Sequence, residues 1–243
     1  MIKLLLLLLS GLKLGKVLIT GGSMLLSVAV YAIFFGWPFA LGFVLLLFIH
    51  ELGHYLAARQ RGLEVGAMAF IPFVGAWVAI RNLEHDAETE AYVGIAGPVL
   101  GTLGALGCYY VARDTDSNLM LALSYSGFLL NLINLIPLSP FDGGRVTQVI
   151  SPRLWLLGVP ILGALFIYHP SPMLVLIGIL ALPSVMRAWN YDPNAPENLH
   201  HGAVSTENKV VYGASYLALA AFLAVMSSDV HEMLSDVAHG YAT

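Results

Sequence analysis

The residues best suited to chemistry in this sequence are His50, Glu51 and His54, within the stretch FIHELGHYLAARQ at 48–60. On a helix, side chains four residues apart lie one above the other, so the two imidazoles can reach the same metal ion. Glu51 is turned from His50 by about 100° and can act on a water molecule without being a ligand. This H-E-x-x-H spacing is typical of zinc peptidases, in which the glutamate is the general base. It predicts His50 and His54 as metal ligands and Glu51 as the catalytic group.

The surroundings of the motif strengthen this interpretation. The preceding residues, 39–49, are wholly apolar and read as part of a membrane span. An ionisable side chain deep in a bilayer costs about 2.5 kcal/mol or more on insertion scales, and such residues are functional by default. The same motif on a soluble helix could arise by chance, but two histidines and a glutamate inside one apolar span indicate a metal site.

A catalytic zinc ion usually has three protein ligands and one open position for water. Asp142 is the candidate for the third ligand, because it is the only acidic residue between Asp116 and Asp192 and follows the apolar run that ends in NLIPLSPFDGGR. Its two glycine neighbours would allow close backbone approach. An N-cap at the membrane edge is the other role that this aspartate could have, and the pairing with the histidine motif favours the ligand.

The composition predicts an integral membrane protein. Of 243 residues, 58% are hydrophobic and only 11% are charged, against roughly 25% charged residues in soluble domains. Eleven lysines and arginines leave no basic stripe for nucleic acid. The single cysteine, Cys108, excludes a disulfide framework within the chain.

Stretches of about 20 apolar residues predict the membrane spans. Two shorter apolar runs between residues 146 and 186, separated by HPSP, could be two short spans or one re-entrant pair. The expected fold is an all-α polytopic membrane protein with about 5–7 transmembrane helices. The candidate spans are Val17–Phe35, Phe39–Ala58, Tyr92–Val111, Asn118–Ile136 and Val210–Met226.

The basic residues predict the orientation. With the N-terminus inside, ten lysines and arginines fall on the inner segments and only Arg113 on the outer ones, which favours a cytoplasmic position for the inner side. Spans two and four then both end on the cytoplasmic side, near Arg59 and Arg145. We expect a multi-pass protein of a prokaryotic inner membrane. We expect residues 1–16 to form an interfacial helix that leads into the first span, rather than a cleaved signal peptide.

Residues 66–80, GAMAFIPFVGAWVAI, do not have the pattern of a helix. They are uncharged, are interrupted by Pro72 and Gly75, and are rich in aromatic and β-branched side chains. A short β-hairpin or loop entering the membrane fits this pattern better. We expect an extended substrate segment to pair with it, near Gly75 and Ala76, as in β-augmentation.

Taken together, HELGH and the later NLIPLSPFDGGR resemble the two motifs of the site-2 protease family of intramembrane zinc metalloproteases. The segments IPFVGA and GIAGPVLG are also similar to that family's embedded strand region and following span. The resemblance implies one Zn²⁺ per chain held by His50, His54 and Asp142, Glu51 as the acid–base catalyst, and Asn134 holding the substrate backbone. It implies hydrolysis of peptide bonds in transmembrane segments of membrane-protein substrates.

The likeness covers the second span through Arg145 and has mild departures, with Phe141 in place of the usual leucine and Ser139 among the prolines. No segment is long and polar enough for the PDZ or CBS domains that many relatives carry, so we expect a compact form. We expect one membrane metalloprotease domain over 1–243, with a catalytic core at about 39–150 and additional spans at about 151–227.

Other interpretations stay open on the sequence alone. A prenyl-protein type of membrane zinc peptidase can also carry HELGH, with a glutamate as third ligand, and Glu64 is the acidic residue close after the motif. A non-enzymatic interpretation is that the protein is a membrane metal transporter or metal binder. Asn131 could serve helix packing or a polar lining, and the His200–His201 pair could bind metal although nothing nearby completes a site. The glycines at 94, 97, 101, 104 and 107 indicate close helix packing.

Overall fold

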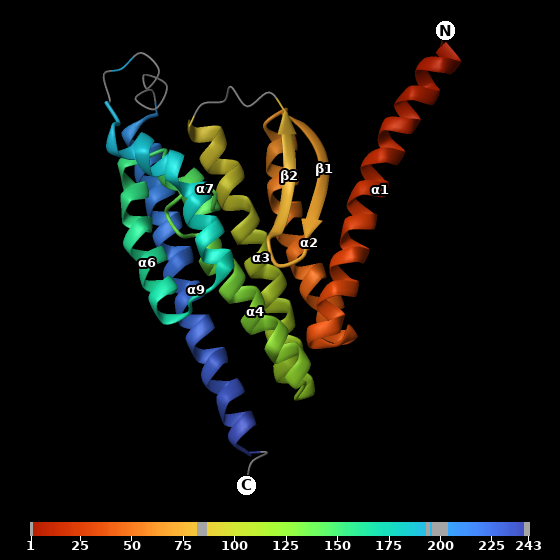
Figure 1. The fold of residues 1–243 in the computed structure, drawn as a ribbon, viewed down its shortest axis with the longest axis vertical. Helices are drawn as coiled ribbons and strands as arrows, with labels where there is room; N and C mark the ends of the chain where they lie inside the picture. Colours follow the sequence, from red (N-terminus) through yellow and green to blue (C-terminus); the bar gives the residue numbers. More distant parts are fainter. Residues whose placement is uncertain (1, 82–86, 193–194, 196–203, 241–243) are drawn as a thin grey trace.

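The computed structural model describes residues 2–81, 87–192, 195 and 204–240 (Figure 1). Nearly all of this part is helical, with one antiparallel hairpin. The elements are α1 (Ile2–Phe35), α2 (Trp37–Gln60), β1 (Glu64–Ile71), β2 (Gly75–Arg81), α3 (Ala87–Thr115), α4 (Asn118–Asn134), α5 (Asp142–Thr147), η1 (Pro152–Leu157), α6 (Gly158–Tyr168), α7 (Pro172–Trp189) and α9 (Thr206–Gly240).

Five of the described helices are long and apolar enough to cross a membrane, within α1, α2, α3, α7 and α9. The expected fold class is thereby confirmed. The fourth predicted span forms α4, whose 17 residues are at the lower limit for crossing a bilayer. Residues 2–14 continue α1 without a break, so the expected interfacial helix is continuous with the first span.

A tight turn at Gly36 connects α1 to α2. Its φ of 81° lies in the left-handed region that glycine adopts without steric penalty, and Pro38 follows within the first turn of α2, a position that tolerates proline. The start of α1, the end of α2 and the start of α3 therefore lie at one end of the molecule, the top of Figure 1, and the C-terminus lies at the other.

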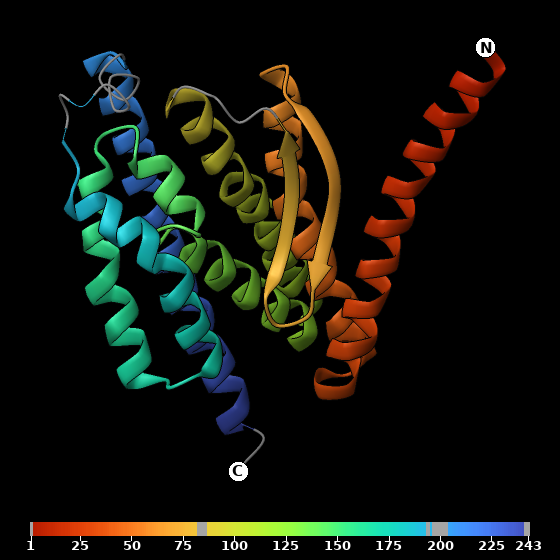
Figure 2. The same ribbon diagram turned by 45° about the horizontal axis from the view of Figure 1, so that its top comes forward.

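The predicted hairpin is present. Strands β1 and β2 pair antiparallel, with Phe70 opposite Ala76 and Met68 opposite Val78, and with a register shift between Val65 and Met68. β1 lies on the α1 side and β2 on the α3 side in both views (Figures 1 and 2). The hairpin shares a buried apolar cluster with α1 and α2, where the rings of Phe48 and Phe70 lie 6.5 Å apart.

Helices α2, α3 and α4 form the centre of the molecule, and glycine sets how closely they approach. A Cβ added at Gly53 of α2 would overlap the carbonyl oxygen of Ala96 in α3. A Cβ at Gly127 of α4 would come within 2.8 Å of the Cβ of Ala105. Of the α3 glycines predicted to pack closely, those at 94, 97, 101 and 104 lie against other elements, whereas a Cβ added at Gly107 would meet nothing within 4 Å.

The C-terminal half packs beside this centre. η1 and α6 lead into α7, which returns antiparallel, and the three share one apolar cluster around Trp155 and Leu162. α9 packs along α4, with Leu223 and Val230 fully buried in a second cluster. α7 is long enough to cross a membrane, whereas Pro152–Tyr168 is a shorter apolar segment. Half of the predicted linker at 190–209, including His200 and His201, lies outside the described residues.

Candidate metal centre

Three side chains from distant parts of the chain meet in the interior of the molecule. Nε2 of His50, Nε2 of His54 and Oδ2 of Asp142 lie 3.1 Å from one another in all three pairs. The three residues are 3%, 4% and 8% exposed. They form a cluster of metal-ligating side chains from α2 and α5, and Glu51 is adjacent to it in the sequence.

The two histidines lie on the face of α2 that is turned to α3. A Cβ at Gly97 of α3 would overlap the ring of His54, and a Cβ at Gly53 of α2 would overlap the backbone of α3 at Ala96. Glycine at these positions therefore does more than bring helices together, because it makes the space that the His54 imidazole fills. Sequence reasoning assigned the α3 glycines to packing and missed this role.

Asp142 reaches the histidines because the chain turns sharply after α4. Helix α4 ends at Asn134, and α5 begins at Asp142 itself. The glycine after it packs directly on the end of α4, since a Cβ at Gly143 would overlap the carbonyl of Leu135. A Cβ at Gly144 would come within 2.6 Å of the backbone nitrogen of Ser139. The DGG sequence is thus required by the close approach of two backbone segments.

Two side chains from the C-terminal half also hold this turn. The indole Nε1–H of Trp155 in η1 donates a hydrogen bond to the carbonyl of Gly144 at 2.8 Å. The hydroxyl of Tyr216 in α9 donates to the carbonyl of Leu135 at 2.5 Å. The two acceptors lie two and seven residues from Asp142 in the chain, so helices beyond the predicted core at 39–150 support the third ligand.

Hydrogen bonds behind the histidines fix their tautomers. His54 Nδ1 lies 2.8 Å from the carbonyl oxygen of Val93, which can only accept, so Nδ1 carries the proton. His50 Nδ1 lies 2.8 Å from Oδ1 of Asn131, whose Nδ2 donates to the carbonyl of Gly127. Both Nε2 atoms therefore direct a lone pair at the carboxylate of Asp142. The structure assigns Asn131, which the sequence left undecided, to orienting His50.

Three electron-pair donors that face one point require a cation between them. Zinc binds imidazole nitrogen at about 2.0–2.1 Å in tetrahedral geometry, which would separate two ligand atoms by about 3.3 Å. The 3.1 Å spacings are close to this value. Ligating histidines almost always donate their other N–H to a carbonyl or carboxylate, as His50 and His54 do here. The donor set therefore fits a zinc ion, and three ligands leave one position open.

Glu51 lies on the flank of α2 between the hairpin and the metal cluster. It is three residues after Phe48, which packs on the hairpin, and three before His54, so it is about 60° from each around the helix. Glu51 is 6% exposed, and Leu47 and Ala58 on the same flank are also buried. A polypeptide that lies along the hairpin and approaches the cluster would pass this carboxyl group.

Residues 38–115 match peptidase family M50. By this match, residues 38–115 are a site-2 protease (M50) domain. The chain is 33% identical over 130 residues to a zinc metalloprotease of Methanocaldococcus jannaschii, covering 51% of this chain and 37% of that protein. It is 35% identical over 129 residues to a zinc-metalloprotease homologue from Synechocystis sp., covering 47% and 33%. The chain thus spans about a third of the length of these curated relatives.

A solved structure also resembles the chain. The site-2 protease from Methanocaldococcus jannaschii matches it with a TM-score of 0.46 and 21% identity over 68% of this chain and 84% of that one. The sequence matches confirm the family predicted from the two motifs. Within the M50 domain lie both histidines and Glu51, while Asp142 lies beyond it.

The predicted substrate-binding residues are not in the metal cluster. The carboxamide of Asn134, at the end of α4, donates to the carbonyl of Leu130 in the same helix at 3.1 Å and is half-buried. Gly75 begins β2 with a φ of 122°, and Ala76 follows it opposite Phe70. Glu64, the alternative third ligand, is exposed at the start of β1 and outside the cluster.

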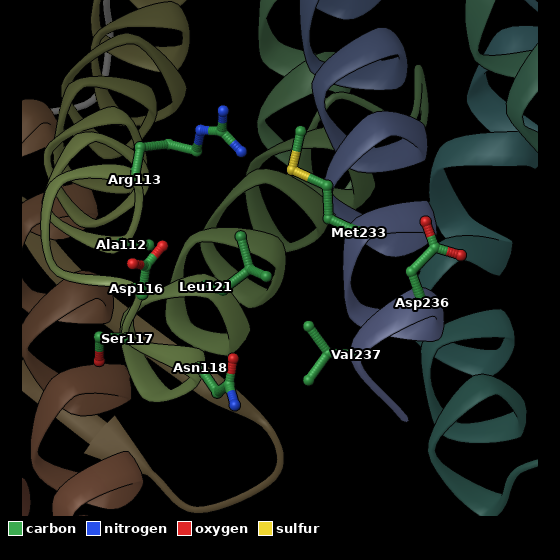
Figure 3. Close-up of a pocket in the computed structure, with 9 residues that line it drawn as sticks. All are labelled: Ala112, Arg113, Asp116, Ser117, Asn118, Leu121, Met233, Asp236 and Val237. Carbon is green, nitrogen blue, oxygen red and sulfur yellow. The ribbon is translucent and has the colours of Figure 1, made fainter. Parts of the chain in front are cut away.

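A separate cavity of about 380 Å³ lies at the opposite end of α3. Its lining residues come from the end of α3, the start of α4 and α9, and Figure 3 shows Arg113 of α3 and Met233 of α9 pointing toward each other. Along the helix, Ala112 is about 22 Å from Gly97. This cavity therefore does not belong to the metal centre of the M50 domain.

Proposed function

We propose that the protein is an intramembrane zinc endopeptidase that hydrolyses peptide bonds in or near transmembrane segments of membrane-protein substrates. The observation that carries the proposal is the triangle of His50, His54 and Asp142, in which both histidines come from α2, a helix long and apolar enough to span a membrane. The match of residues 38–115, which include both histidines and Glu51, to peptidase family M50 supports peptidase chemistry at this site.

Each residue of the site has a proposed role. His50, His54 and Asp142 would hold the zinc ion, and Asn131 and the Val93 carbonyl would keep the two imidazoles in the ligating tautomer. Zinc bound there would act as a Lewis acid toward water and the substrate carbonyl. Glu51 would accept the proton of the attacking water and deliver it to the leaving amine as the C–N bond breaks.

The hairpin offers a surface for an unwound substrate. A substrate helix must first open, because its amides are tied up in internal hydrogen bonds. Since Met68 and Phe70 direct their backbone groups away from β2, their partners Val78 and Ala76 direct theirs to the other side of the hairpin. An extended segment could pair there, with Gly75 leaving room at the turn and Asn134 binding the backbone beyond it.

The physics of the bilayer supports this edge as a binding surface. Unpaired strand edges do not occur against lipid and are tolerated only where they border protein or water. No described residue outside the hairpin is hydrogen-bonded to the backbone of Ala76 or Val78. Pairing with a substrate strand would satisfy these groups.

Sidedness is part of the same proposal. The N-terminus, the end of α2 and the start of α3 lie at one end of the molecule (Figure 1), the end to which the sequence assigns most lysines and arginines. The excess of basic residues favours a cytoplasmic position for this end, in a prokaryotic inner membrane. The substrate would therefore be cut near the cytoplasmic boundary of its span.

The alternatives find less support. The prenyl-protein type of site needs a glutamate ligand. Glu64 is exposed and does not belong to the cluster of His50, His54 and Asp142. A transporter needs ligands along a path through several spans, whereas the single described cluster with metal-ligating geometry is His50, His54 and Asp142.

The test compares wild type with Glu51→Gln in proteoliposomes that contain a purified transmembrane-peptide substrate. Glu51→Gln removes the proton acceptor and keeps the shape of the side chain, so it should retain zinc and lose cleavage by about 100-fold or more. Ser126→Ala, whose hydroxyl bonds to Ala122 of its own helix, is the matched control. Unchanged cleavage by Glu51→Gln would contradict the proposal.

A further inference from the structure

The outer edge of β1 is hydrogen-bonded to side chains of α1, although α1 is a helix. The hydroxyl of Thr20 donates to the carbonyl of Met68 at 3.0 Å and accepts from the N–H of Met68 at 3.1 Å. The N–H of Phe70 donates to Ser23 Oγ at 3.2 Å. These bonds occupy the positions that a third strand would take beside β1.

The contact continues at both ends of the strand. Lys16 Nζ donates to the carbonyl of Val65 at 2.8 Å, and the N–H of Phe73 donates to the hydroxyl of Tyr31 at 2.9 Å. The α1 stripe is the name used below for Lys16, Thr20, Ser23 and Tyr31. Residues three or four apart share one helical face, and the stripe follows that spacing, with Ser27 between its last two members. Figure 2 shows β1 along this side of α1.

We propose that the α1 stripe acts as a surrogate third strand, and that Thr20 and Ser23 are positioning residues for substrate binding at β2. A two-stranded hairpin is marginally stable by itself, and its two outer edges are equivalent templates for pairing. The α1 stripe occupies the outer edge of β1 and holds β1 in place, which in turn fixes the position of β2, whose outer edge stays open. The hairpin thereby accepts a substrate strand on the β2 side alone, next to the flank that carries Glu51.

Apolar packing alone would not produce this selectivity. α1 and the hairpin already share buried side chains, and the ring of Tyr31 lies 5.1 Å from that of Phe73. Such contacts are non-directional, so they hold α1 near β1 without fixing the register or satisfying the backbone. Hydroxyl groups at the spacing of strand amides do both. The inference rests on the proposed function only where it concerns substrate.

The first test measures amide exchange and does not depend on activity. The variant is Thr20→Val with Ser23→Ala, in lipid nanodiscs, followed by NMR. The amides of Met68 and Phe70 lose their acceptors and should exchange about tenfold faster or more, whereas Ala69, which pairs across the hairpin with Trp77, should stay protected. Unchanged exchange at Met68 and Phe70 would overturn the proposal. Equal acceleration at Ala69 would also overturn it, since the hairpin itself would have opened.

The second test separates KM from kcat for the transmembrane-peptide substrate. Loss of a positioned β2 edge should raise KM by about five- to tenfold and leave kcat and zinc content unchanged. The conservative pair Thr20→Ser with Ser23→Thr keeps both hydroxyls and should restore KM. Thr115→Val with Ser126→Ala removes hydroxyls that bond to their own helices and should change neither constant.

A second variant and the exchange experiment cover the cases in which the double variant does not fold or wild type shows no cleavage. If Thr20→Val with Ser23→Ala does not fold, Tyr31→Phe removes one acceptor and keeps the ring, and should accelerate exchange at Phe73 and raise KM. A fall in kcat at constant KM, in either variant, would contradict a positioning role. If wild type cleaves no peptide at all, the proposed function fails, and the exchange experiment still decides whether the α1 stripe is a surrogate strand.

Discussion

The imidazole of His50 and the carboxamide of Asn131 lie 81 positions apart in the chain and meet at 2.8 Å. The contact joins α2 to α4 and orients the histidine for its role as a ligand. Gly101 of α3 makes it possible, because a Cβ there would overlap Asn131 Oδ1. The three central helices thus meet at the group that supports the metal centre.

Asn131 should matter for metal affinity, unlike the other asparagine of the same helix. Asn131→Ala leaves His50 Nδ1 without its acceptor, so zinc affinity should fall by about 10–100-fold. Asn134→Ala removes an amide that bonds within its own helix and should leave zinc affinity unchanged. Competition with a fluorescent chelator measures both. Equal affinities in the two variants would exclude the role of Asn131.

Gly97 should tolerate no side chain, because the ring of His54 occupies the space. Gly97→Ala should displace the imidazole and lower both zinc affinity and the melting temperature of the zinc-loaded protein, as overpacking costs roughly 1–3 kcal/mol. Gly107→Ala lies on the same helix, where an added Cβ meets nothing within 4 Å, and should be neutral or slightly stabilising. Normal zinc binding by Gly97→Ala would show that α3 does not limit the site.

Trp155 should influence the metal centre from outside the M50 match. Trp155→Phe keeps an aromatic ring and removes an N–H that donates to the Gly144 carbonyl. That carbonyl still accepts from the N–H of Gln148 at 3.2 Å, so the change costs one net hydrogen bond, about 0.5–1.5 kcal/mol. We expect a several-fold loss of zinc affinity. The control is Trp189→Phe, because Trp189 is 77% exposed. Identical affinities for both tryptophan variants would argue that η1 does not support Asp142.

Much of this architecture could be predicted from local sequence. Long apolar runs identify membrane helices because a bilayer demands about 20 such residues, and a Pro- and Gly-interrupted aromatic segment identified the hairpin at 66–80. HELGH identified two ligands because helical spacing alone places His50 and His54 together. Asp142 could be nominated because no other acidic residue occurs near the end of α4.

The remaining features depend on which helices pack together, and one sequence does not contain that information. Asn131 and Asn134 are the same residue type on the same helix, and only the position of α2 distinguishes their roles. The glycines of α3 have a packing pattern, yet only the ring of His54 reveals what Gly97 accommodates. The hydroxyls of Thr20 and Ser23 are unremarkable in an apolar helix until β1 is found beside them.

The central claim is that α2 and the turn after α4 together form one zinc site, with Asp142 completing a set begun 92 positions earlier at His50. Zinc content per purified chain, measured by mass spectrometry after dialysis against a weak chelator, tests it most directly. Wild type and Glu51→Gln should each hold about one zinc ion per chain, and Asp142→Ala should hold almost none. Full zinc occupancy in Asp142→Ala would contradict the account.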